Sequence, residues 1–111
     1  MKFTQEELPG GALKVTLEGA LDIAGAGVID LPFNIIAGSR KKILLDFTKV
    51  DFLASIGIRV LVQMARTVGQ RGGVVVLLNP NDAARRVLMS TGVDTIIKLV
   101  DDEASAMAAI A

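Results

Sequence analysis

The 111-residue sequence contains no cysteine and no histidine, and its only aromatic residues are four phenylalanines. Without cysteine the chain can form no disulfide framework and can perform no thiolate chemistry. Without histidine, a Ser-His-Asp triad and an ordinary zinc site are both excluded. The scarcity of aromatic rings means that the hydrophobic core must be aliphatic, and a chain that is 51% apolar can build one.

The chain also lacks an excess of either charge, because twelve acidic residues balance twelve basic ones. The cations are scattered, so sequence-independent binding to nucleic acid has little electrostatic basis. No segment reaches the roughly 18 uninterrupted apolar residues that a membrane-spanning helix needs. The opening string MKFTQEELPGG lacks the apolar centre of a signal peptide. We therefore expect a single cytoplasmic domain, residues 1–111, that contacts neither nucleic acid nor a membrane.

Apolar patterning predicts five strands. Leu13, Val15 and Leu17 alternate with polar residues, which is typical of a half-buried strand. The polar segment Lys2–Glu7 is a weaker candidate, and the turn signal Pro9–Gly11 would join the two as a hairpin. Mostly apolar runs predict the remaining strands, which are Ile43–Phe47, Val74–Leu78 and the shorter Ile96–Val100.

The segment between the second and third strands is the hardest to assign. Gly25, Gly27 and Pro32 all disfavour a continuous helix. We therefore predict a loop or frayed turn, followed by a helix from about Asp30 to Ala37 with Pro32 in its first turn.

A second helix with a clear apolar stripe is predicted from about Ile56 to the turn at Gly72-Gly73. Val60 and Met64 lie on the flank of this stripe, where we expect partial exposure. The apolar stripe consists of Ile58, Leu61, Val62, Ala65 and Val68, and the opposite, polar stripe consists of Arg59, Gln63, Arg66 and Gln70.

Two further helices are predicted nearer the C-terminus. Asn79 has the character of an N-cap, with Pro80 at the first helical position and Gly92 as the C-cap. The acids that open Asp101–Ile110 favour a terminal helix there. Strands that alternate with helices after a hairpin indicate an α/β fold, with a mostly parallel or mixed sheet of about five strands and about four helices.

Ser55 lies at the junction between a strand and the second helix. The apolar run is closed by Asp46, a short polar loop follows, and Phe52–Gly57 leads into the helix. Ser55 therefore sits where a helix presents unpaired N–H groups and a partial positive charge. Serine often caps helices, so a purely structural role is the simplest alternative. Asp22 and Asp46, at the predicted strand ends, are likewise more simply interpreted as turn or cap residues than as a metal pair.

Several strings along nearly the whole chain resemble the STAS domain, in particular the bacterial anti-sigma factor antagonists. Gly19–Asp22 is similar to the family's Gly-x-Leu-Asp, and Leu45–Phe52 is similar to its Leu-Asp-Leu-x-x-Val-x-Phe. Leu53–Ile58 resembles the phosphorylation segment of the family, and both Asn79-Pro80 and Thr91–Asp94 match its later signposts. Each string is weak alone, but their order and spacing together are strongly specific.

The resemblance implies a phosphorylation switch. In the family, the serine at the position of Ser55 is phosphorylated by a partner that is both an anti-sigma factor and an ATP-dependent serine kinase. The unphosphorylated antagonist binds that partner and frees the sigma factor, and a serine phosphatase reverses the modification. A non-enzymatic monomer without cofactor or metal is implied. The implied partner surface consists of Asp22, Ala54, Ser55, Ile56, Gly57, Arg59, Val60 and Gln63.

Two features depart from the family pattern. Ala54 precedes the serine where the family usually has Asp, and Gly25, Gly27 and Pro32 replace better helix formers before the third strand. The polar stripe that includes Arg59 is either a solvated helix face or, because it is close to Ser55, part of a partner surface.

Two other functions stay open from the sequence. The chain could be a scaffold STAS module that acts in trans on a lipid transporter or in a stress-signalling assembly. It could instead be a hydrolase that uses Ser55. Without histidine the base would be a carboxylate or a lysine, and Lys49 is the only lysine near Ser55 in sequence.

Overall fold

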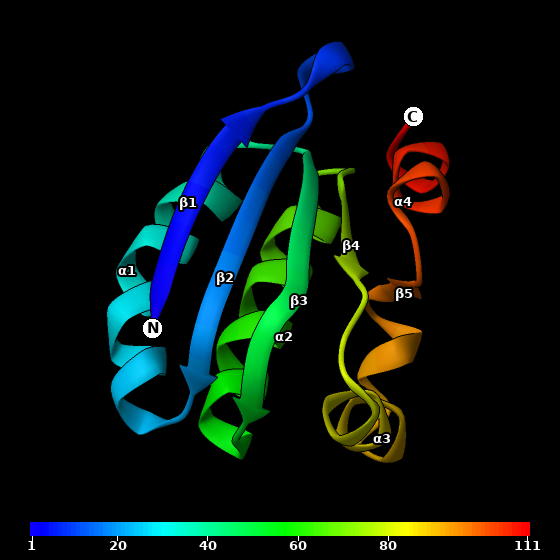
Figure 1. Ribbon diagram of the computed structural model, residues 1–111. Helices are drawn as coiled ribbons and strands as arrows, with labels where there is room; N and C mark the ends of the chain where they lie inside the picture. The colour runs from blue at the N-terminus through cyan, green and yellow to red at the C-terminus, as the bar shows by residue number, and fades with distance from the viewer.

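The computed structural model describes residues 1–111 and contains one five-stranded sheet with the strand order β1-β2-β3-β4-β5. β1 and β2 form an antiparallel hairpin, and the other neighbouring strands are parallel. The predicted α/β fold with a mixed sheet and an initial hairpin is therefore confirmed (Figure 1). The strands are β1 (Lys2–Glu7), β2 (Leu13–Leu21), β3 (Lys42–Leu53), β4 (Val74–Leu78) and β5 (Lys98–Val100), and the α-helices are α1 (Ile23–Ser39), α2 (Ser55–Gln70), α3 (Asp82–Ser90) and α4 (Glu103–Ile110).

The helices divide unequally between the two faces of the sheet. α1 and α2 lie next to one another behind β1, β2 and β3, whereas α4 packs against β3, β4 and β5 (Figure 1). Because side chains alternate along a strand, Ile43 and Leu45 of β3 enter a core of 25 buried residues that includes α1 and α2. Leu44 between them enters a core of only seven buried residues, which α4 covers. The first face therefore carries most of the core.

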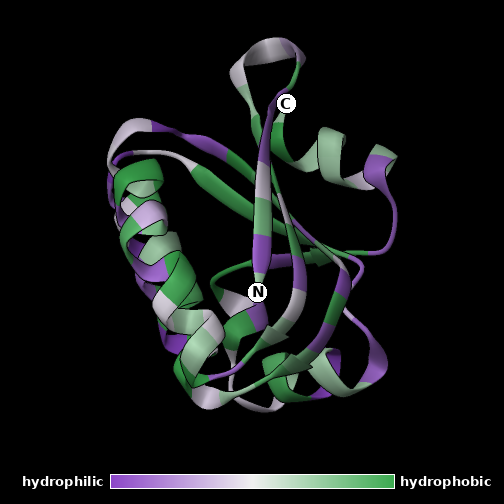
Figure 2. Cartoon of the chain, turned by 60° about the vertical axis from the view of Figure 1, so that its left-hand side comes forward, coloured by the Kyte–Doolittle hydropathy of each residue, from purple (hydrophilic) through white to green (hydrophobic).

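The predicted start of the first helix at about Asp30 is wrong, because α1 begins at Ile23. The Asp22 carboxylate accepts a hydrogen bond from the backbone N–H of Gly25 at 2.8 Å and caps the helix. Each glycine inside a helix costs about 1 kcal/mol. Complete burial of Ile29 and Phe33 offsets that cost, so packing extends the helix through residues that disfavour it. Figure 2 shows hydrophobic colours around much of α1.

β3 is also longer than predicted. It runs from Lys42 to Leu53, so the polar residues after Asp46 belong to the strand and not to a loop. β3 pairs with β2 up to the last residue of both strands, with two register shifts that accommodate the irregular segment. Pairing with a neighbour thus extends a strand that its own polar residues would end.

The N-cap of α3 is Asn81 and not Asn79 as predicted. The Asn81 side chain accepts a hydrogen bond from the backbone N–H of Ala84 at 2.8 Å. Asn79 instead has a left-handed backbone, with φ of 54°, and its N–H donates to the Val100 carbonyl. The chain therefore leaves β4 through Asn79 and a buried Pro80 before the helix begins.

The buried face of α2 is rotated around the helix relative to the prediction. Val60 and Met64, expected to be partly exposed, are only 6% and 1% exposed. Ile58 and Val62, which were expected in the apolar stripe, are only half-buried. α2 packs against α1 as well as against the sheet, so the flank that carries Val60 and Met64 is covered.

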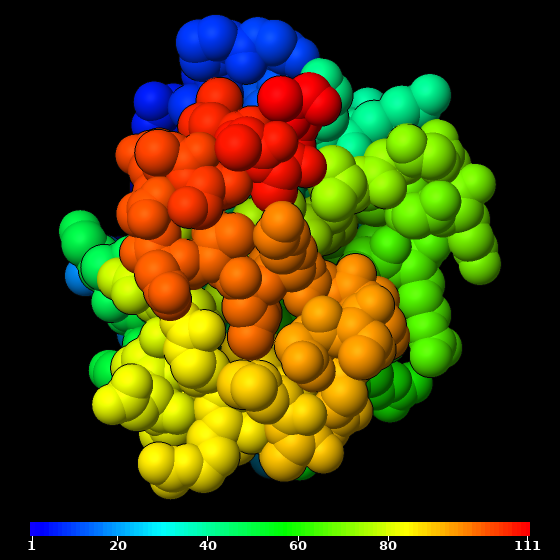
Figure 3. All heavy atoms as spheres, turned by 90° about the vertical axis from the view of Figure 1, so that its right-hand side faces the viewer, coloured from blue at the N-terminus to red at the C-terminus, as the bar shows by residue number.

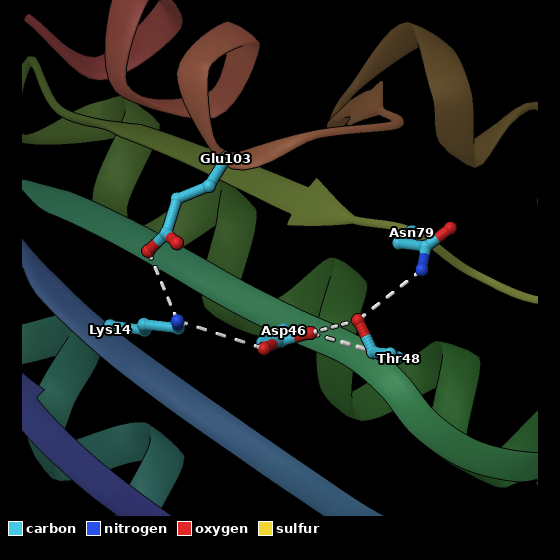
Figure 4. Close-up of polar contacts among 5 residues, drawn as sticks. All are labelled: Lys14, Asp46, Thr48, Asn79 and Glu103. Carbon is cyan, nitrogen blue, oxygen red and sulfur yellow. Dashed lines mark hydrogen bonds and ion pairs between the residues drawn. The ribbon is translucent and has the colours of Figure 1, made fainter.

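A polar cluster joins α4 to the second face of the sheet. Figure 3 shows α4, in orange and red, next to the blue turn between β1 and β2. Near the start of α4, the Lys14 ammonium lies 3.0 Å from Glu103 Oε1 and 3.8 Å from Asp46 Oδ2 (Figure 4). The hydrogen bond to Glu103 raises the pKa of Lys14.

Asp46 also accepts hydrogen bonds from the backbone N–H and the hydroxyl of Thr48, and Asn79 donates to that hydroxyl (Figure 4). Asp46 lies inside β3, so the prediction that it is a turn or cap residue at a strand end is wrong.

Candidate partner-docking site

Ser55 is the first residue of α2, directly after the carboxyl end of β3. Its side chain is exposed, as a site for modification requires. The N-cap residue is Ala54, which has an extended backbone, and no side chain caps this end of the helix. The alternative that Ser55 serves as the N-cap is therefore wrong.

The first turn of α2 leaves backbone donors free beside the serine hydroxyl. The Ala54 carbonyl accepts hydrogen bonds from the N–H groups of Gly57, at 3.0 Å, and Ile58, at 3.2 Å. The N–H groups of Ser55 and Ile56 come earlier and have no partner within the helix. Together with the helix dipole, they create a positive potential where a phosphoryl group on Ser55 would lie.

A close approach between α2 and the end of β2 holds Ser55 in place. The Ala54 N–H donates to the Leu21 carbonyl at 3.0 Å. A Cβ on Gly57 would lie 2.5 Å from Leu21 Cγ and 2.9 Å from the Leu21 carbonyl oxygen. Gly57 is therefore required by packing at this position. Because Gly57 is buried, the structure gives it a supporting place beneath the predicted partner surface.

Asp22 lies at the same end of the sheet as Ser55. Leu21 of β2 is opposite Leu53 of β3, so the residues that follow the two strands come to the same edge. The interpretation of Asp22 as a cap residue is confirmed, because one carboxylate oxygen bonds to the Gly25 N–H. Its negative charge lies at the start of α1, near the start of α2.

A groove between α1 and α2 brings together four of the predicted partner residues. Val60 forms part of its buried floor, whereas Arg59 and Gln63 are exposed along its α2 side. Asp30 and Asn34 supply polar groups from α1. The residues that line the groove are Ile23, Ala26, Gly27, Asp30, Asn34, Ile56, Arg59, Val60 and Gln63.

A second hollow follows the outer face of α2 and includes Ser55 itself. Arg59 follows Ser55 by four residues, a spacing that places the two side chains next to each other on a helix. Arg66 lies further along the same hollow. The hydroxyl therefore shares this face with two cations, and Arg59 belongs to both the hollow and the groove.

Two large apolar side chains near Ser55 are absent from the predicted partner surface. Ile23, at the start of α1, is 82% exposed, and Phe52, near the end of β3, is 55% exposed. Uncovered apolar groups beside a polar groove favour contact with another protein. Ile23 follows Asp22 directly, and an apolar residue after an aspartate N-cap could have indicated the first turn of a helix. The prediction of a loop in this segment is the reason that Ile23 was not included in the partner surface.

The alternative of a hydrolase that uses Ser55 depends on a metal site or on a base near the hydroxyl. No group of three or more acidic side chains is placed to hold a metal ion. Lys49, the candidate base, is four residues before Leu53 on β3, so it lies roughly 13 Å back along the strand.

None of the helices combines the length and the apolar character needed to cross a membrane.

A mixed five-stranded sheet, an exposed serine at the start of the second helix and a groove beside it define a small α/β domain. The STAS domain family matches residues 5–106. The chain therefore belongs to the STAS domain family.

Three relatives extend this result. A Thermotoga neapolitana protein, described as an anti-sigma factor antagonist and TM1081 homolog, is 35% identical over 66 residues, or 60% of this chain and 58% of that relative. The crystal structure of the Thermotoga maritima protein tm1081, also described as an anti-sigma factor antagonist, has a TM-score of 0.89 and 24% identity, and the match covers 97% of this chain and 93% of that one. The structure of Bacillus SpoIIAA in its phosphorylated form has a TM-score of 0.77 and 21% identity, over 99% of this chain and 100% of that one.

Proposed function

We propose that this STAS domain is an anti-sigma factor antagonist that binds an anti-sigma factor kinase while Ser55 is unmodified and releases it when Ser55 is phosphorylated. The observation that carries the proposal is the exposed Ser55 hydroxyl at the start of α2, a helix end that no side chain caps. The antagonists among its relatives and the phosphorylated form of SpoIIAA support it. The protein would act in the cytoplasm by binding and not by catalysis, and a serine phosphatase would reset it.

The unmodified surface offers a partner both apolar area and polar anchors. Ile23 and Phe52 are exposed, and a docked partner would bury them. Burial of one such side chain contributes about 1.5–3 kcal/mol. Arg59 and Gln63 along the groove supply hydrogen-bond donors that orient the partner. Ser55, a small neutral side chain, would lie inside the contact at little cost.

Phosphorylation would add about −1.5 to −2 charges at pH 7 to this contact. Within the free antagonist the charge is tolerated, because the N–H groups of Ser55 and Ile56 and the Arg59 side chain all lie within the first turns of α2. Within the complex the same charge would be desolvated. Leaving a charge buried and unpaired at an interface costs about 3–5 kcal/mol. Release of the partner follows from this difference.

Arg59 provides a second route from the phosphate to the groove. Its side chain lines both the groove and the hollow that contains Ser55. An ion pair with a phosphate on Ser55 would draw the guanidinium toward the start of α2. The groove would then lose its cation opposite Asp30, so modification would change the shape and charge of the docking surface as well as adding a negative group.

Binding of the chain to an anti-sigma factor kinase, measured by calorimetry, tests the proposal. We expect Ser55→Asp to weaken binding by roughly a hundredfold or more and Ser55→Ala to bind without regard to ATP. Thr67→Asp is the matched control, because Thr67 is exposed in the same hollow of α2 but lies further along the helix and does not line the groove. It adds the same charge and should leave binding nearly unchanged.

Phosphopeptide mapping after incubation with the kinase and ATP completes the test. We expect about one phosphate per chain, located on Ser55, and none in Ser55→Ala. If Ser55→Asp bound the kinase as tightly as the unsubstituted chain, or if phosphate appeared on another residue, the proposed switch would be wrong.

A further inference from the structure

α1 exposes a stripe of large apolar side chains on the side away from α2. Val28, Leu31 and Ile35 are 46%, 68% and 63% exposed. Their spacing of three and four residues aligns them along one side of the helix. The buried face of α1 is a different one and includes Ile29 and Phe33. The stripe is therefore an apolar surface of α1 that nothing within the chain covers.

The free edge of the sheet runs beside this stripe. β1 pairs only with β2, so its other side has no neighbouring strand. Leu31 and Ile35 line a hollow together with Phe3 and Gln5 of β1. Figure 2 brings this side forward and shows β1 running down the centre of the view, with nothing in front of it and α1 beside it. Strand edge and stripe thus form one continuous side of the molecule.

The hydrogen bonds of the hairpin determine which backbone groups of β1 face this edge. Leu8 donates its N–H to the carbonyl of Ala12, the residue directly opposite in the hairpin register. Hydrogen-bonded pairs alternate along an antiparallel ladder, so every second residue back from Leu8 bonds to β2. The residues between them direct their N–H and C=O groups to the free edge, and they are Phe3, Gln5 and Glu7.

A second copy of the chain matches this edge in one register. With Thr4 opposite Thr4 of the second copy, Phe3 of each chain lies opposite Gln5 of the other, and their outward backbone groups can exchange hydrogen bonds. A register shifted by two residues would place Phe3 opposite Glu7 instead. That register would also place Lys2 opposite Leu8 and Glu6 opposite Thr4, so it would leave both charges without a partner on the other strand.

The charges on β1 are complementary in the same register. Lys2 of each chain lies opposite Glu6 of the other, and the two-fold axis repeats this pair. Both side chains are exposed on the polar face of the sheet, with Lys2 opposite Glu18 and Glu6 opposite Lys14 within the hairpin. Net charge is zero, so the whole molecules do not repel each other.

We propose that the chain forms a two-fold symmetric dimer in which the β1 strands pair and the α1 stripes pack against each other. An axis through the two Thr4 residues and perpendicular to the sheet keeps both α1 helices on the same face. The hollow beside Phe3 and Gln5 places Leu31 and Ile35 close to that axis. The two sheets would join into one of ten strands. This dimer replaces the monomer that the family resemblance implied.

The dimer leaves the docking site for the kinase free. The groove beside Ser55 uses the opposite flank of α1, through Asp30 and Asn34, together with α2. The dimer proposal therefore does not rest on the proposed function, and each can fail alone.

Sedimentation equilibrium on the full chain and its charge variants tests the pairing. We expect a reversible dimer of the 11.7 kDa chain. Lys2→Glu and Glu6→Lys each place like charges opposite each other twice, and each should weaken self-association at least about tenfold. A mixture of the two variants makes both pairs attractive again, so it should form a heterodimer that neither variant forms alone.

The apolar half of the surface is tested by Ile35→Asp, which should also weaken the dimer at least about tenfold. Ile96→Asp is the matched control, because Ile96 is an exposed apolar residue next to β5, at the opposite edge of the sheet. Urea unfolding of each variant confirms that the fold is retained.

Two outcomes would overturn the proposal. One is a monomer at all concentrations up to about 1 mM, in which case Lys2 and Glu6 only protect the strand edge from pairing. The other is a dimer that keeps its affinity in the charge variants and in Ile35→Asp.

Discussion

α1 and α2 occupy neighbouring places on one face of the sheet, yet their outer surfaces differ. In α2 the two sides are separate, because Leu61 is fully buried while Arg59 and Gln63 face solvent. In α1 the exposed side also carries large apolar residues such as Leu31 and Ile35, and polar residues such as Asp30 lie on the flank toward α2. A polar outer face is stable in water, whereas an apolar one favours contact with another surface.

The N-termini of the two helices also differ, because a side chain caps α1 and no side chain caps α2. Asp22 caps α1 by accepting the Gly25 N–H, and no side chain caps α2, where Ala54 is the N-cap. The comparison teaches that binding capacity is divided between the helices. α2 offers a charge-sensitive end whose N–H groups are free for a phosphate, and α1 offers a permanent apolar side that phosphorylation does not reach.

The largest expected effect is on the free energy of unfolding. It compares a substitution at a buried position of α2 with one at an exposed position of α1. Leu61→Ala in α2 removes a fully buried side chain and should lower the free energy of unfolding by about 2–5 kcal/mol. Leu31→Ala in α1 should change it by less than about 0.5 kcal/mol, because Leu31 is exposed.

Urea denaturation at low protein concentration, where the chain is monomeric, measures both. Equal losses would contradict the comparison by showing that Leu31 is covered within one chain. At higher concentration, Leu31→Ala should weaken self-association, while Leu61→Ala should act through the fold alone.

An intermediate effect on stability is expected from removing the N-cap of α1 and from adding one to α2. Asp22→Ala removes the cap of α1 and should lower the free energy of unfolding by about 1 kcal/mol. Ala54→Asp supplies a cap to α2 and should raise it by about the same amount. Thermal and urea unfolding measure both changes, and Ala54→Asn is the control that supplies the hydrogen bond without the charge. A loss of stability in both Ala54 variants would mean that the N–H groups at the start of α2 are not free.

The smallest expected effect is a loss of stability at acid pH, which arises from an ion pair at the C-terminal end of α1. Arg40, the C-cap residue of α1, bonds to Glu7 of β1, and this hydrogen bond lowers the pKa of Glu7. A carboxylate with a lowered pKa contributes stability above its unfolded pKa, about 4.3, and the contribution is lost as pH falls through the folded pKa. The wild-type chain should therefore lose stability in acid by more than Glu7→Gln does.

Urea unfolding between about pH 6 and about pH 3 measures this difference. A second link to α1 does not involve Glu7, because Arg71 after α2 donates hydrogen bonds to the carbonyls of Ala37 and Arg40. An identical acid profile for the wild-type chain and Glu7→Gln would show that the ion pair contributes nothing to holding α1.

Local signals predicted most elements but not their limits. Period-two alternation was enough for β2, and β4 agrees with the predicted Val74–Leu78, because each pattern reflects one strand's own burial. The start of α1 was missed since Gly25 and Pro32 disfavour a helix locally, and packing of Ile29 and Phe33 against the sheet outweighs them. The full length of β3 was missed because its last residues depend on pairing with β2.

For the candidate site, the residues near Ser55 in sequence were predictable and the facing residues from α1 were not. Ile56, Arg59 and Gln63 follow from one helical pattern. Asp30 and Asn34 enter the groove only because α1 lies beside α2.

The sequence by itself determined that a serine stands where a strand gives way to a helix, because chain direction, apolar period and helix start are all local properties. Only the tertiary structure decided which apolar side chains stay uncovered, from Ile23 beside that serine to Ile35 beside the free edge. Burial depends on contacts between residues far apart in the chain, so no local pattern can distinguish an apolar residue that the core covers from one that another molecule must cover.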